Sequence, residues 1–268
     1  MNSRIGFIGS GKMANAIIKG IIDSKFCNDK DIVVSDLNKE ALSSAQKDFG
    51  ITPVDSNICV ANQCDILILA VKPFVLKDVL TEIKPFINKN KLIISIAAGI
   101  SIATIQEIVG EIPIIRVMPN TPALVNEGMS AICKGDFAKE QDTNLALDIF
   151  KSVGKVVELD EKYIDIVTGI SGSGPAFYYY IINEIAKAGE KLGLDYQTCL
   201  KLSAQTAYGA AKMVMETGVT PEQLIINVTT PGGTTEVGNN ILKDSNISDI
   251  LYDTIKGTME KSKALGKN

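Results

Sequence analysis

A glycine-rich turn near the start of the chain constrains the fold more than any other feature. The segment Gly9-Ser10-Gly11-Lys12-Met13-Ala14 follows an apolar run, residues 4–8, and opens a stretch with helical periodicity, residues 11–24. Gly9 permits a tight turn, Gly11 lets the backbone approach a pyrophosphate, and Ala14 is small enough for helix–strand packing. The helix N-terminus then offers free N–H groups to phosphates. We expect a dinucleotide cradle; the alternative is a tight turn that binds nothing.

The first half of the chain alternates short apolar runs with helical stretches. Strands are expected at residues 4–8, 31–35, 66–71, 92–96, 112–117, 129–133 and 155–158, with helices at 11–24 and 38–49. Asn38 is expected to cap the second helix. Runs that are apolar on both faces are typical of strands buried in a parallel sheet. The pattern therefore predicts a doubly wound α/β sheet, over residues 1–160.

From about Asp160 onward the chain changes to nearly continuous helix. Residues 174–193 form an amphipathic pattern, and residues 197–216 are rich in small side chains that let a second helix approach closely. This half has few turns and little room for a core of its own. We therefore expect residues 161–268 to form an all-helical domain whose apolar faces meet another subunit.

Composition limits the chemistry that this chain can perform. The 268 residues include no His, which excludes Ser-His-Asp triads, His-ligated zinc and His proton shuttles. The net charge is 27 − 31 = −4, and no basic block supports nucleic-acid binding. Five cysteines without a C-x-x-C pair are expected to be reduced thiols, with no metal bound.

The N-terminal segment and the apolar runs give no sign of a membrane or export destination. The chain opens without a basic region followed by an apolar region and a cleavage site. The longest apolar run, residues 92–100, is far too short to span a bilayer. We expect a cytoplasmic protein with no membrane partner.

Two charged residues at expected strand ends are candidates for cofactor contacts. Asp36 ends the second strand, where a carboxylate can bind a ribose 2′-OH and repel a 2′-phosphate, which favours NADH over NADPH. The alternatives are that Asp36 only starts a turn, and that Lys39 serves a phosphate instead. Lys72 lies at the carboxyl end of the third run, where ligands bind in open α/β sheets; a solvated lysine is the alternative.

A second glycine-rich turn, Thr229-Thr230-Pro231-Gly232-Gly233-Thr234-Thr235, interrupts the helical half. Proline and two glycines do not favour a helix interior, so a helix is expected to resume near Thr234. Successive N–H groups at such a start suit a carboxylate, and three threonine hydroxyls add donors. The alternative is an interhelical turn with a threonine as its cap.

Five short motifs run through the chain from end to end. They are Gly6-Phe7-Ile8-Gly9-Ser10-Gly11, Ala70-Val71-Lys72-Pro73, Met118-Pro119-Asn120-Thr121-Pro122, Ser171-Gly172-Ser173-Gly174-Pro175-Ala176 and Thr230-Pro231-Gly232-Gly233-Thr234-Thr235. In this order and spacing they resemble the pyrroline-5-carboxylate reductases. The resemblance implies a Rossmann-type domain followed by a helical dimerisation domain, in a homo-oligomer that is at least a dimer. It also implies reduction of 1-pyrroline-5-carboxylate to L-proline by NADPH or NADH, the last step of proline biosynthesis. Rings of dimers occur in the family.

The resemblance also implies roles for individual residues. The cofactor would be held by Gly11, Lys12, Met13, Asn57, Ala70, Lys72, Pro73, Ala97 and Ala98. These join Gly9 and Asp36, which the residue pattern itself indicates as cofactor contacts. The substrate would be held by Thr230, Gly232, Gly233, Thr234 and Thr235, with the N–H groups of Gly233 and Thr234 on its carboxylate. Thr235 would contact the ring nitrogen as the catalytic residue. Glu236 stands where an apolar residue is expected.

Hydride transfer by a nicotinamide agrees with the absence of His, because the protein then supplies orientation and electrostatics. Thr235 is too weak an acid to protonate an imine unaided, so we expect it to orient the nitrogen or to relay a proton from water. One alternative is a related reductase of another cyclic imine or a hydroxyacid. The lysine pattern of β-hydroxyacid dehydrogenases is not matched around Lys187 and Lys191. Another is a nucleotide sensor that lacks the chemistry.

Overall fold

A computed structural model of the chain describes residues 3–266. Contacts within it form two compact units. The first contains the described residues up to Ser173 together with those from Lys256 onward, and the second is Gly174–Ile255. The boundary between residues 160 and 161 stays a prediction. No helix in the described part of the chain is both long and apolar enough to cross a membrane.

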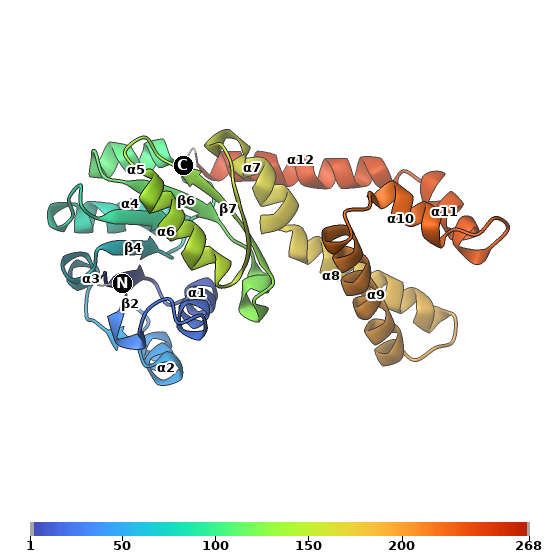
Figure 1. Cartoon of the computed structure of the whole chain (residues 1–268), viewed down its shortest axis with the longest axis horizontal. Helices are drawn as coiled ribbons and strands as arrows, with labels where there is room; N and C mark the ends of the chain where they lie inside the picture. Colours follow the sequence, from blue (N-terminus) through green and yellow to red (C-terminus); the bar gives the residue numbers. More distant parts are fainter. Residues whose placement is uncertain (1–2, 267–268) are drawn as a thin grey trace. The chain divides into compact units, whose positions relative to one another are not determined.

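The first unit is built on one eight-stranded sheet with the order β3-β2-β1-β4-β5-β6-β7-β8 (Figure 1). Only β7 runs antiparallel to a neighbour, β6; the other pairs are parallel. The doubly wound α/β prediction is thus confirmed. The strands are β1 (Ile5–Ile8), β2 (Ile32–Ser35), β3 (Thr52–Pro53), β4 (Ile66–Leu69), β5 (Leu92–Ser95), β6 (Ile114–Met118), β7 (Gly128–Lys134) and β8 (Gly154–Glu158).

Helices cover both faces of this sheet, and each face has its own apolar core (Figure 1). Ile66 and Ile68 of β4 belong to one core, and Leu67 and Leu69 to the other, because successive strand residues point to opposite faces. The first core is covered by α1 (Lys12–Asp23), α2 (Lys39–Phe49) and α6 (Glu140–Lys151). The second is covered by α3 (Asn57–Gln63), α4 (Pro73–Ile83) and α5 (Ile102–Val109).

Asn38 caps α2 as predicted, because its side chain accepts hydrogen bonds of 3.1 Å from the N–H groups of Glu40 and Ala41. Short 3-10 turns punctuate the first unit: η1 (Asp29–Asp31), η2 (Lys84–Phe86), η3 (Thr121–Val125) and η4 (Glu161–Tyr163). All five cysteines are free, and Cys64, Cys133 and Cys199 are buried. Burial raises the pKa of the Cys64 and Cys133 thiols to about 12.

The end of the first unit holds an unusual turn and a returning helix. After α7 (Ile164–Val167), the chain forms a π-helix, η5 (Thr168–Gly172), closed by a 2.8 Å bond from the Ser173 N–H to the Thr168 carbonyl. The last turns of α12 (Ile247–Leu265) also belong to this unit. There the Ser262 hydroxyl donates to Asp165 at 2.6 Å, and a Cβ on Gly99 would lie 2.9 Å from Leu265 Cβ.

The second unit consists of helices, as predicted: α8 (Gly174–Lys191), α9 (Tyr196–Glu216), α10 (Pro221–Val228), α11 (Thr234–Lys243) and the start of α12. These helices bury few of their apolar side chains. Tyr178, Tyr180 and Ile185 on α8 are 64%, 67% and 57% exposed. Many exposed apolar side chains on one set of helices are typical of a protein–protein interface, which agrees with the expectation that these faces meet another subunit.

Candidate active site

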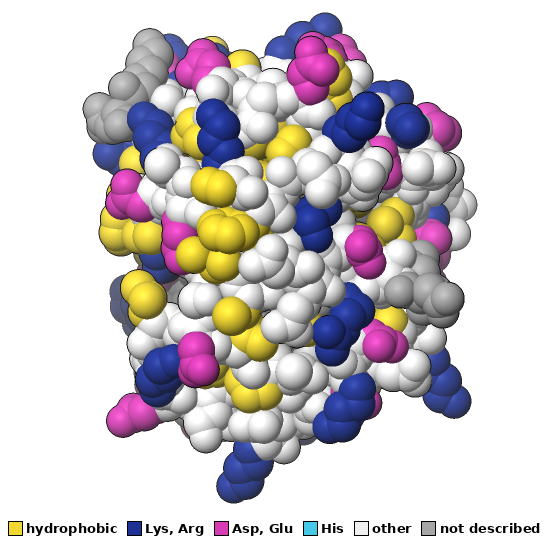
Figure 2. Space-filling view, turned by 90° about the vertical axis from the view of Figure 1, so that its left-hand side faces the viewer, with side chains coloured by type: hydrophobic (Ala, Val, Ile, Leu, Met, Phe, Trp, Pro, Cys, Tyr) yellow, Lys and Arg dark blue, Asp and Glu magenta, His cyan; other side chains and the backbone are white. Residues whose placement is uncertain are grey.

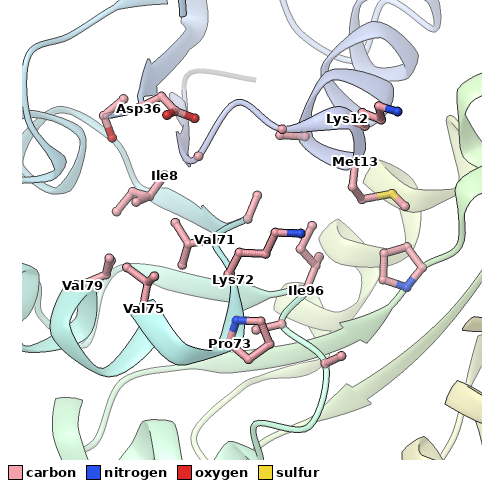
Figure 3. A pocket seen from close by; sticks show the side chains of 18 of the residues that line it. Ile8, Lys12, Met13, Asp36, Val71, Lys72, Pro73, Val75, Val79 and Ile96 are labelled. Carbon is pink, nitrogen blue, oxygen red and sulfur yellow. The ribbon is translucent and has the colours of Figure 1, made fainter. Parts of the chain in front are cut away.

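A cavity of about 730 Å³ opens at the carboxyl ends of β1, β2, β4 and β5 (Figure 3). The crevice outside these strand ends is where ligands bind in open α/β sheets. The structure brings all eleven predicted cofactor residues to this cavity: Gly9, Gly11, Lys12, Met13, Asp36, Asn57, Ala70, Lys72, Pro73, Ala97 and Ala98. Residues that are up to 89 positions apart in the sequence (9 to 98) thus surround one space.

The first glycine-rich turn has the geometry that a dinucleotide requires. Gly9 has φ +103°, and a Cβ there would lie 2.7 Å from the Ala70 carbonyl oxygen, so only glycine fits. Gly11 has φ −70°, and no described atom lies within 4 Å of where its Cβ would be. The space above Gly11 is therefore open at the start of α1, where a pyrophosphate can meet the helix N-terminus without a Cβ in the way.

Asp36 lies at one end of the cavity (Figure 3), and its carboxylate is held by three donors. Its Oδ2 accepts hydrogen bonds from the Ser10 N–H at 2.6 Å and the Ser10 hydroxyl at 2.8 Å. Its Oδ1 accepts from the Asn38 N–H at 2.7 Å. Asp36 thus both starts the turn before α2 and fixes a negative charge beside the glycine-rich turn. Lys39 was the alternative phosphate ligand. Its Nζ lies 3.6 Å from Asp55 Oδ1, in an ion pair.

Two further predicted residues line the cavity in different ways: Asn57 is held by its neighbours, and the Lys72 ammonium is not. Asn57 accepts a 2.8 Å hydrogen bond from the Ser35 hydroxyl and donates a 2.7 Å bond to Glu82, which fixes its amide at the cavity wall. The Lys72 side chain points into the middle of the cavity (Figure 3). It makes no hydrogen bond or ion pair with any described residue, so its ammonium is available to a ligand.

Sequence reasoning gave no role to several apolar residues in the cavity wall: Leu37, Val75, Val79, Ile96, Met118 and Leu124. Leu37 is the clearest of these, because its side chain is 92% exposed directly after Asp36. A large apolar side chain left in water beside a cavity is typical of a platform for a ring. Its position two residues beyond the end of β2 was the signal available in the sequence.

The second glycine-rich turn lies in the second unit, and two of its N–H groups are used internally. Gly232 has φ +75°, and its N–H donates to the Glu236 carboxylate at 2.7 Å. The Gly233 N–H donates to the Thr230 carbonyl at 2.8 Å, although the resemblance implies that it binds the substrate. The N–H groups of Thr234 and Thr235, which begin α11, have no acceptor among the described residues. These two remain free for an anion.

Metal and nucleic-acid sites find no support in the described structure. Among residues 3–266, no group of three or more Cys, Asp and Glu side chains is arranged to hold a metal ion. The face of the molecule drawn in Figure 2 carries cationic and anionic side chains interspersed with apolar ones.

Two family models match this chain. The model described as pyrroline-5-carboxylate reductase dimerisation matches residues 161–265. The model described as NADP oxidoreductase coenzyme F420-dependent matches residues 4–99. The first covers the helices with exposed apolar faces, and the second covers the glycine-rich turn and most of the cavity wall.

Relatives with curated names match over the whole length. A pyrroline-5-carboxylate reductase of Methanosarcina acetivorans is 41% identical over 267 residues, which is 99% of each chain. One of Glycine max is 40% identical over 97% of this chain and 95% of its own. By contrast, a solved structure of a Mycobacterium tuberculosis 3-hydroxyisobutyrate dehydrogenase shares the fold alone, with 15% identity and a TM-score of 0.55 over 82% of this chain and 72% of its own.

Solved structures agree with the relatives. The Coxiella burnetii pyrroline-5-carboxylate reductase superposes with a TM-score of 0.94 at 33% identity over all of both chains. The Plasmodium falciparum pyrroline carboxylate reductase, solved with NADP bound, has a TM-score of 0.89 at 36% identity over 99% of this chain and 98% of its own. From its two glycine-rich turns to its helical dimerisation segment, this chain belongs to the pyrroline-5-carboxylate reductase family.

Proposed function

We propose that the protein reduces 1-pyrroline-5-carboxylate to L-proline with a nicotinamide dinucleotide, as the last step of proline biosynthesis. The observation that carries the proposal is the second turn, where two free N–H groups begin a helix within the dimerisation segment. An anion site of this kind suits a substrate with one carboxylate and needs neither Arg nor His. The cavity in the first unit supports the cofactor half of the reaction.

The chain's own residues would hold the cofactor and leave the hydride chemistry to it. Gly11, Lys12 and Met13 would bind the pyrophosphate at the start of α1, and Asn57 would lie near the adenosine ribose. The nicotinamide end would be lined by Ala70, Lys72, Pro73, Ala97 and Ala98. The bound NADPH or NADH supplies the hydride that the imine carbon accepts.

The second turn would position the imine. The N–H groups of Thr234 and Thr235, with the Thr230 hydroxyl, would hold the carboxylate, while Gly232 and Gly233 shape the turn through their internal bonds. Thr235 would orient the ring nitrogen or relay a proton to it from water, because an alcohol stays protonated near neutral pH. Fixing the carboxylate would aim the imine carbon at the hydride donor, which is catalysis by positioning.

We further propose a preference for NADH, which Asp36 supports. Three donors hold its carboxylate at the end of the cavity, where its charge would repel a 2′-phosphate. Asp36→Asn removes the charge and keeps one of the two acceptor oxygens. The ratio of kcat/KM for NADPH to that for NADH should therefore rise in the variant. A wild-type protein that works better with NADPH would refute the preference.

We also propose that the protein acts in the cytoplasm as a homodimer, or as a ring of such dimers, through residues 161–268. Exposed apolar side chains on α8 support the dimer. Light scattering coupled to size-exclusion chromatography measures the mass directly, and 28.7 kDa would mean a monomer and contradict this part.

The decisive experiment is oxidation of NADH and NADPH by the purified protein, with and without 1-pyrroline-5-carboxylate. Oxidation that requires the imine and yields proline supports the proposal. Absence of turnover from folded protein that still binds a cofactor would refute it, and would favour another cyclic imine or a hydroxyacid, and then a nucleotide sensor. L-Proline should inhibit weakly, since it carries the same carboxylate.

A further inference from the structure

Glu236 is a charged residue in the second turn to which neither the resemblance nor the mechanism gives a role. It is the third residue of α11 and is half-buried. Its Oε2 accepts a 2.7 Å hydrogen bond from the Gly232 N–H, four residues earlier. A bond of this length to a carboxylate is charge-assisted and stronger than one between neutral groups.

The position of this contact is unusual for a helix start. A glutamate at the third helical position commonly accepts from the N–H of the capping residue, which here is Gly233. The Gly233 N–H is already bound to the Thr230 carbonyl, so Glu236 reaches one residue further back. There it holds Gly232, whose φ of +75° only glycine adopts readily.

A second side chain of α11 holds the other end of the same turn. The Asn239 amide donates a 3.0 Å hydrogen bond to the Thr229 hydroxyl. Residues 236 and 239 are three apart and so lie on one side of the helix. The turn between Thr229 and Gly232 is thus fastened at both ends to the helix whose first N–H groups are free.

The Glu236 carboxylate has no cationic partner in the part of the chain that the structure describes. It forms no ion pair within residues 3–266, and its described contact is the bond to Gly232. An uncompensated carboxylate two residues away from the Thr234 N–H opposes the approach of a second carboxylate. The same side chain therefore orders the turn and lowers its affinity for an anion.

We propose that Glu236 is a positioning residue for the imine: its acceptor oxygen fixes the turn that aims the substrate, and its charge weakens substrate binding. This inference rests on the proposed function, because it takes the second turn as the site of the substrate carboxylate. The two effects are separable. Glutamine keeps the acceptor and loses the charge, whereas alanine loses both.

The test compares steady-state kinetics of wild type, Glu236→Gln and Glu236→Ala with 1-pyrroline-5-carboxylate varied. Glu236→Gln should lower KM about threefold to tenfold and keep kcat within about twofold. The inhibition constant of L-proline should fall in parallel. In 1 M salt the difference in KM should nearly vanish, since the screening length drops to about 3 Å. Glu236→Ala should lower kcat about tenfold relative to Glu236→Gln, because misplacement of the substrate slows the chemical step.

Glu222→Gln is the matched control. Glu222 is exposed in the first turn of α10, in the same unit, and its carboxylate makes no hydrogen bond or ion pair with described residues. The Glu222→Gln variant should therefore have the same KM and kcat as wild type. Far-UV circular dichroism and cofactor binding check that each variant is folded.

Each outcome decides part of the inference. A KM for Glu236→Gln equal to or above that of wild type overturns the role of the charge, and an equal kcat for the alanine and glutamine variants overturns the positioning role. If Glu236→Ala does not fold, Glu236→Asp replaces it, since the shorter side chain keeps the charge and loses the reach to Gly232. A wild type that does not reduce the imine overturns the proposed function as well, whereas an active wild type with unaltered variants overturns this inference alone.

Discussion

Replacing Gly9 with alanine is expected to damage the fold, whereas the same change at Gly11 is expected to damage cofactor binding alone. At Gly9 the backbone has φ +103°, a conformation that costs a side chain of the L series about 1–3 kcal/mol. The new Cβ would also lie 2.7 Å from the Ala70 carbonyl oxygen, and relieving such an overlap costs roughly 1–3 kcal/mol more. We expect Gly9→Ala to lose about 2–6 kcal/mol of the free energy of unfolding, a large part of the total for a typical domain.

Gly11→Ala is the matched control for stability. Gly11 has an ordinary φ of −70°, and no described atom lies within 4 Å of the new methyl group. Its free energy of unfolding should stay within about 0.5 kcal/mol of wild type, as for most changes that touch nothing. The methyl group would project into the space meant for the pyrophosphate, so the Kd for the cofactor should rise roughly tenfold to a hundredfold.

Urea unfolding followed by far-UV circular dichroism measures the free energy of unfolding. All variants are compared at one protein concentration, because the protein is expected to associate. The chain has no Trp, so cofactor binding is best followed by NADH fluorescence or calorimetry. Equal stability of Gly9→Ala and wild type, or equal losses of stability in both variants, would refute the reasoning.

Three further changes have definite expected outcomes. Thr235→Ala should lower kcat about 10²- to 10⁴-fold in the imine assay, and unchanged turnover would remove Thr235 from the mechanism. Arg116→Ala should lower the free energy of unfolding by about 3 kcal/mol in urea, because the buried guanidinium lies 2.8 Å from Glu161; a loss below 1 kcal/mol would contradict this. Because burial raises the pKa of the Cys64 and Cys133 thiols from 9.0 to about 12, the stability they contribute is complete below pH 9 and is lost as the pH rises toward 12. The fall in urea midpoint between pH 8 and pH 10.5 should therefore be smaller in the double alanine variant than in wild type, and an equal fall would refute the assignment.

The central strands could be predicted because they are buried on both faces. Every residue of β1, β4 and β5 is buried, so each reads as a continuous apolar run. The two-residue strand β3 was not predicted. It pairs with β2 through Thr52 and Pro53, which lie at the edge of the sheet and carry no apolar pattern. Edge strands need few buried side chains, and the sequence signal is correspondingly weak.

The residues that line the cofactor cavity could be predicted because they too lie in segments with strong local signals. Gly9, Gly11 and Lys72 lie where strands end and helices begin, and these boundaries have strong local signals. The hydrogen-bond partners of the cavity residues, by contrast, have no local signal in the sequence. Asp36, for example, is held by Ser10, which lies 26 residues earlier in the chain. This contact depends on how the ends of two strands meet in space.

The π-helix η5 and the internal bonds of the second turn were not predicted either. A π-helix is held by backbone bonds between residues five apart, such as the bond from the Ser173 N–H to the Thr168 carbonyl, and these bonds need no particular side chain. In the second turn, the family resemblance implies that the Gly233 N–H binds the substrate carboxylate, whereas in the structure this N–H donates to the Thr230 carbonyl. Which N–H groups of a turn form bonds within the turn depends on its backbone dihedral angles. A run of Pro and Gly does not determine these angles from sequence alone.

The return of α12 to the first unit has a consequence for how the protein is made. A ribosome adding 5–20 residues per second passes through residues 174–255 in roughly 4–16 seconds. During that interval the nascent first unit lacks the segment that contacts Gly99 and Asp165. Gly99 adjoins Ala98 in the cavity wall, so a newly synthesised chain is expected to acquire its full affinity for the dinucleotide only after α12 has emerged from the ribosomal tunnel.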